Sequence, residues 1–134
     1  MIDIETEIFN AIAQRLRVKY QNIFVTGEYV KAPPSFPCVS LFEIDNVVHR
    51  STRTNSNIEN FATVSYEINI YSNKLKGKKS ECKEIAAIID DEFMKMGFTR
   101  TMLNPIPNEQ DATVYRMVGR YRAVVSKQKV IYRR

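Results

Sequence analysis

The sequence predicts an α+β domain in which two helices pack against one mostly antiparallel β-sheet. Two stretches repeat apolar residues at helical spacing, two long stretches alternate apolar and polar residues as strands do, and proline or glycine separates them. The 134 residues, 44% of them hydrophobic, are enough for a single domain over 1–134 with one core. The expected order of elements is α-β-β-β-α-β-β.

The first element is a helix over residues 3–19. Its apolar stripe repeats every four residues, and acids in its first turn and bases in its last suit the helix dipole. A short β-prone run at 23–26 ends at Gly27, and the three prolines of 31–37 exclude a helix or a central strand. The stripe consists of Ile4, Ile8, Ile12 and Leu16.

A long hairpin is expected next. A strand over 38–47 leads into the polar stretch 49–60, and a second strand follows over 62–70. Strict alternation in this second strand indicates an antiparallel sheet with one buried and one exposed face. The apolar set is Ala62, Val64, Tyr66, Ile68 and Ile70, and the polar set is Thr63, Ser65, Glu67 and Asn69.

The second half repeats the pattern of one helix and further strands. A helix is expected over 79–96, closed by Gly97, then a short strand over 98–103 and a proline-marked loop over 104–111. We expect Ile85, Ile89 and Phe93 to pack with Ile8, Ile12 and Leu16 against the sheet. The final strand, 112–126, presents Tyr115, Met117, Gly119, Tyr121, Ala123 and Val125 to the core.

No pattern indicates catalysis, a metal or a cofactor, so the chain is not expected to be an enzyme. Cys38 and Cys82 are isolated and are expected to be buried apolar side chains. His49 lies in a polar stretch without an orienting partner. The run Asp90–Glu92 fans around its helix and is expected to be a solvated face. No segment is apolar enough to cross a membrane, and the N-terminus has no secretory signal.

Positive charge gathers toward the C-terminus. The net charge is +5, and residues 112–134 contain seven basic side chains and no acid. Residues 126–134 form a basic arm, which is either a frayed end or a strand added to a neighbour's sheet. The arginines of the final strand share one face, which is either solvated or an interface with acidic subunits or phosphates. The interface candidates are Arg116, Arg120, Arg122, Lys127, Lys129, Arg133, Arg134, Arg50 and Arg53.

Residues 2–125 resemble the tail-terminator (tail-completion or neck) proteins of long-tailed bacteriophages. The resemblance rests on an amphipathic N-terminal helix and on short motifs at the ends of the expected strands and of the second helix. These motifs are Phe36-Pro37, Asp45-Asn46, a strand from Val64 ending in Tyr71-Ser72-Asn73, Met96-Gly97-Phe98, Asn104-Pro105, and Val114-Tyr-Arg with Arg120-Tyr-Arg122.

The resemblance implies a structural virion protein made in the host cytoplasm. Such proteins form a homohexameric ring that terminates the tail tube and contacts the tube protein and the head-completion or connector protein. DNA passes through the ring, without sequence-specific binding. The alternative is a small basic nucleic-acid-binding module, but Tyr115 and Tyr121 lie on the core face, where they cannot stack on bases.

Overall fold

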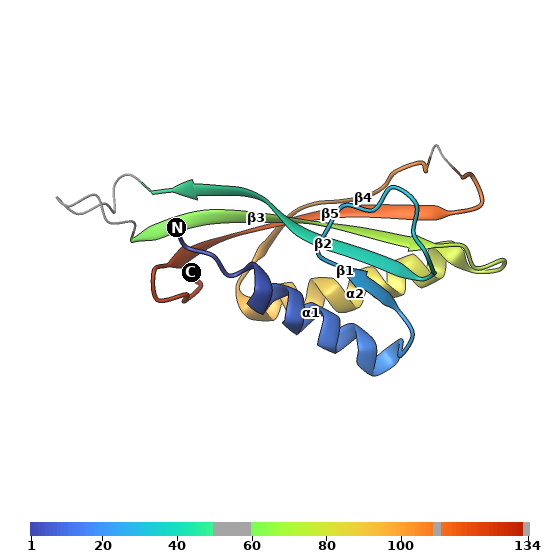
Figure 1. Cartoon of the computed structure of the whole chain (residues 1–134), viewed down its shortest axis with the longest axis horizontal. Helices are drawn as coiled ribbons and strands as arrows, with labels where there is room; N and C mark the ends of the chain where they lie inside the picture. Colours follow the sequence, from blue (N-terminus) through green and yellow to red (C-terminus); the bar gives the residue numbers. More distant parts are fainter. Residues whose placement is uncertain (50–59, 109–110, 133–134) are drawn as a thin grey trace.

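A computed structural model describes residues 1–49, 60–108 and 111–132. It has the expected order α-β-β-β-α-β-β, so the predicted α+β class is confirmed (Figure 1). The elements are α1 (Glu5–Lys19), β1 (Phe24–Thr26), β2 (Cys38–Val48), β3 (Phe61–Ser72), α2 (Lys78–Met96), β4 (Thr99–Pro105) and β5 (Tyr115–Ser126).

The strands form one sheet in the order β1-β2-β3-β5-β4. β3 pairs antiparallel with β2 on one side and with β5 on the other, and β4 pairs antiparallel with β5. β1 runs parallel to β2, so the connection 27–37 has to return the chain to the same end of the sheet. The sheet is therefore mostly antiparallel, as predicted.

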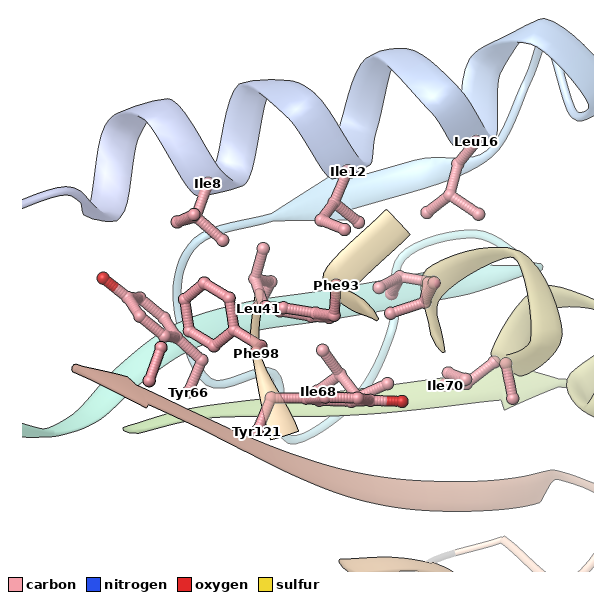
Figure 2. Packing of buried hydrophobic residues seen from close by; sticks show 14 of the residues in the cluster. Ile8, Ile12, Leu16, Leu41, Tyr66, Ile68, Ile70, Phe93, Phe98 and Tyr121 are labelled. Atoms are coloured by element: carbon pink, nitrogen blue, oxygen red, sulfur yellow. The ribbon is translucent and has the colours of Figure 1, made fainter. Parts of the chain in front are cut away.

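Both helices cover the same face of the sheet (Figure 1). The predicted stripes of α1 and α2 are buried, at 3% exposure or less, and they meet the apolar face of β3. Figure 2 shows Ile8, Ile12 and Leu16 of α1 pointing toward Phe93 and the sheet. Tyr115, expected in the core, is only half-buried at its edge.

The outer face is the side of the sheet away from the helices, and within residues 1–49, 60–108 and 111–132 it is covered at one end. The connection 27–37 crosses it there (Figure 1), and the Tyr71 hydroxyl donates a hydrogen bond to the Val30 carbonyl at 3.2 Å. Cys38, Tyr71 and Val114 form a second buried cluster beneath this connection, with Phe36 packed against it. This end of the sheet is therefore buried on both faces. Asn69, expected on an exposed polar face, is fully buried.

The N-terminus differs from the prediction. α1 begins at Glu5 rather than at residue 3, with Ile4 at its N-cap, and both Ile2 and Ile4 pack into the core ahead of the helix. The Asn46 side-chain amide of β2 donates to the Ile2 carbonyl at 2.8 Å, which holds this segment against β2. The predicted stripe therefore starts one residue before the helix itself.

Candidate interaction surface

The three arginines of β5 lie on the outer face, but they differ in environment. Arg116 is half-buried, and its Nη2 and Nε donate to the Asn69 Oδ1 at 2.7 and 3.1 Å. Its guanidinium carbon lies 5.7 Å from the centre of the Tyr71 ring. Because Asn69 and Tyr71 both engage this guanidinium within the subunit, Arg116 holds the covered end of the outer face together. The contact with another molecule that the sequence suggests for Arg116 stays a prediction.

Arg120 and Arg122 lie farther along the uncovered part of the outer face. Arg120 forms an ion pair with Glu67 of β3 at 3.1 Å, and the Glu67 side chain is only 14% exposed. Arg122 is exposed and has no hydrogen bond or ion pair with any residue that the structure describes. Of the three arginines, Arg122 is therefore the one whose charge is available to a partner.

Arg122 lines an open hollow at the corner of the sheet, with a volume of about 560 Å³. The hollow lies where α2 ends, β4 begins and the C-terminal turn folds back. Phe98 forms part of its wall, while Met94 and Tyr132 are 53% and 58% exposed at this site. The hollow thus combines a free cation with apolar surface, which suits an apolar side chain beside a carboxylate.

The basic arm after β5 folds onto its own chain through residue 132. It is neither the frayed end nor the strand added to a neighbour's sheet that the sequence suggested. Residue 131 forms a bridge with Val125, and the Tyr132 N–H donates to the Val124 carbonyl at 2.7 Å. Lys129 contacts Glu7 of α1 at 3.3 Å, whereas the Lys127 side chain is exposed. The arm through residue 132 is therefore part of the domain. The other candidates, Arg50, Arg53, Arg133 and Arg134, lie outside the described residues.

The opposite edge of the sheet carries an exposed apolar residue that sequence reasoning missed. β2 has a bulge between Glu43 and Asp45, where the pairing with β3 shifts by one residue. Ile44, at the bulge, is 41% exposed, and Asp45 beside it is exposed as well. Because of the extra residue at the bulge, odd-numbered residues of β2 such as Leu41 face the helices before it and even-numbered ones such as Val48 do so after it.

Glu43, the residue just before Ile44 at the bulge, is held by hydrogen bonds to β3 and α1. The Glu43 carboxylate accepts a hydrogen bond from the Tyr66 hydroxyl at 3.2 Å, and the Glu43 N–H donates to the Glu5 carboxylate at 2.7 Å. Burial raises the pKa of the Glu43 carboxyl, and the charges of Glu5 and Asp3 raise it further. This group therefore binds its proton more tightly in the folded chain than in the unfolded chain.

We predict that this carboxyl makes the stability depend on pH. Folding raises the pKa of Glu43. The stability that this carboxyl contributes is therefore fully present below its unfolded-state pKa, and it is lost as the pH rises through its folded-state pKa. Glu43→Gln removes the titration, so the variant should gain stability relative to the wild type between pH 4 and pH 7. Denaturant unfolding at both pH values measures this, with exposed Glu28→Gln as control. A difference in free energy of unfolding between Glu43→Gln and the wild type that is the same at both pH values would contradict this prediction.

The acidic run of α2 has structural partners in the fold. Asp90 accepts a hydrogen bond from the buried Tyr121 hydroxyl at 2.7 Å and contacts Arg100 at 3.3 Å. Asp91 contacts Arg15 at 3.4 Å and Lys95 at 3.1 Å. The expectation of a solvated face was therefore wrong for Asp90, whose side chain is 28% exposed and anchors the core.

The remaining chemistry-bearing residues are dispersed. Cys38 and Cys82 are both fully buried, as predicted, and burial raises the pKa of the two thiols to about 11 and about 12. His49 contacts the Thr63 hydroxyl. Across residues 1–49, 60–108 and 111–132, no group of three or more His, Cys, Asp or Glu side chains is placed to hold a metal ion. No helix in these ranges is long and apolar enough to cross a membrane.

Comparison with models of known protein families gives no match, and comparison with curated proteins gives none either.

Proposed function

We propose that this chain is a structural subunit of a bacteriophage particle. In this proposal it is a tail terminator, whose ring ends the tail tube and joins it to the head-side connector. The tube protein and the head-completion protein are its partners, and it acts in the virion after assembly in the host cytoplasm. No catalytic step is part of this function. DNA passes through the ring without being read.

The observation that carries the proposal is the uncovered part of the outer face. Beyond the connection 27–37, this face combines an exposed apolar side chain, Val47 at 51% exposure, with the charged side chains of Asp45 and Arg122. Apolar residues beside charges of both signs are typical of surfaces that bind protein. A phosphate-binding face carries a cluster of free cations, whereas two of the three arginines here are satisfied within the subunit. The resemblance of residues 2–125 to tail terminators indicates which proteins this surface would bind: other copies of the chain, the tube protein and the head-completion protein.

We predict that the purified chain assembles into a ring in the absence of DNA. Native mass spectrometry should detect a species with about six times the 15.6 kDa mass of one chain, and negative-stain images should show rings. If the chain instead stays monomeric and binds DNA with an affinity that falls steeply as the salt concentration rises, the alternative of a basic nucleic-acid-binding module is correct.

A further inference from the structure

We propose that the subunits of this ring join through the bulge of β2 on one copy and the Arg122 hollow on the next. Ile44 enters the hollow, and the Asp45 carboxylate accepts hydrogen bonds from the Arg122 guanidinium. The inference rests on the proposed function, because it names the contact that closes the ring. The occupant of the hollow is a second copy of this chain.

The register of the sheet places the two partners at the same level. Asp45 pairs with Ser65, Ser65 pairs with Arg122, and Arg122 pairs with Thr99 at the start of β4. Asp45 and Arg122 therefore lie in one row across the strands. Among the described strands, Asp45 is on the outermost one at this level, and Arg122 is on the strand next to the other edge. If neighbouring copies are related by rotation about an axis parallel to the strands, Asp45 of one copy lies at the same height along that axis as Arg122 of the next copy. Such a contact closes into a ring rather than climbing into a filament.

The chemistry of the two sites is complementary. The hollow is lined by Arg122 and by Met94 and Tyr132, whose side chains are both exposed in the isolated chain. The bulge offers an exposed branched apolar side chain, Ile44, directly followed by an exposed carboxylate, Asp45. Burial of the apolar groups supplies the affinity, and the arginine–carboxylate pair sets the register and excludes a misplaced neighbour.

Side chains have to make this contact because both sheet edges are unsuited to a continuous ladder. Among the described residues, β1 covers the edge of β2 only from Cys38 to Ser40, and the bulge at Ile44 interrupts the edge beyond. On the other side, the pairing of β4 shifts between Arg100 and Met102. Bulges of this kind prevent the strand of one copy from pairing with the edge strand of the next. The specific contact is therefore made by a side chain, Ile44, that enters the hollow of the neighbouring copy.

The test is a charge exchange in the full chain. Asp45→Arg and Arg122→Asp each set like charges against each other in the proposed contact, so each should raise the protein concentration of half-assembly by at least about tenfold. The double variant restores an opposite pair and should return to within about threefold of the wild type. Assembly is followed by native mass spectrometry across a dilution series, and thermal melting verifies that every variant is folded.

Lys76→Asp is the matched control, because it makes the same charge reversal as Arg122→Asp but in the exposed turn after β3, beyond Ser72 and away from the row at Ser65. Rings that persist in both single variants would overturn the contact and leave the proposed function standing. Dissociation in the control, or failure of the double variant to recover, would also overturn it. A wild-type chain that stays monomeric at every concentration would remove the proposed function together with the contact.

Discussion

Replacing Phe93 with alanine is expected to lower the free energy of unfolding by about 3–5 kcal/mol. The Phe93 ring is fully buried between the helices and the sheet (Figure 2). It stacks on Tyr121 at 4.2 Å between ring centroids with an interplanar angle of 8°, and it meets the edge of Phe98 at 5.0 Å. Three elements meet at this ring, so its removal leaves a cavity that no single side chain can fill.

Met94→Ala is the control for this prediction. Met94 is the next residue of α2 but is 53% exposed, so its truncation should change the free energy of unfolding by less than about 1 kcal/mol. Denaturant titration of the two variants under conditions that keep the chain monomeric measures the difference. Equal losses would mean that the stacked rings do not form the centre of the core.

The second large effect is expected at Gly119 in the middle of β5. A Cβ atom at this position would lie 3.0 Å from Ile68 Cγ1 and 3.2 Å from Leu103 Cδ1, both on strands that flank it. Gly119→Val should therefore lower the free energy of unfolding by about 1–3 kcal/mol through overpacking, despite the preference of valine for strands. The backbone here is ordinary strand, so the need for glycine comes from close approach.

Ile68→Ala gives a direct test of that reason. Alone, it should cost about 2–5 kcal/mol by opening a cavity opposite Gly119. Combined with Gly119→Val, the added methyl groups occupy part of that cavity, so the double variant should be more stable than the sum of the two losses predicts. Denaturant unfolding of the four proteins gives the coupling energy. Strict additivity would show that Gly119 is required for another reason.

Periodicity predicted the parts of this fold in which one side of an element meets the core. The stripes of α1 and α2 and the alternation of β3 are local patterns, and each follows from burying one face of a regular element. The covered end of the outer face was missed because it depends on where the connection 27–37 lies, which no local pattern specifies. Asn69 has the pattern of an exposed strand residue, but the fold buries it and sets the Arg116 guanidinium against its side chain.

The candidate site was only partly predictable for a similar reason. The sequence singled out the arginines of β5 by charge, but their partners come from strand pairing. Asn69 and Glu67 reach Arg116 and Arg120 only because β3 and β5 pair in one register. The difference between the satisfied Arg120 and the free Arg122 is therefore a property of the sheet.

The contact between Lys129 and Glu7 brings the two ends of the chain together, and Figure 1 marks both termini at the same end of the molecule. At the other end, the turn between β3 and α2 carries Leu75 fully exposed, so a break there would interrupt no strand pairing. A circular permutant that links the present ends and opens at this turn keeps every pair of the sheet. Which element comes first along the chain is therefore incidental to this architecture, whereas which strands are neighbours defines it.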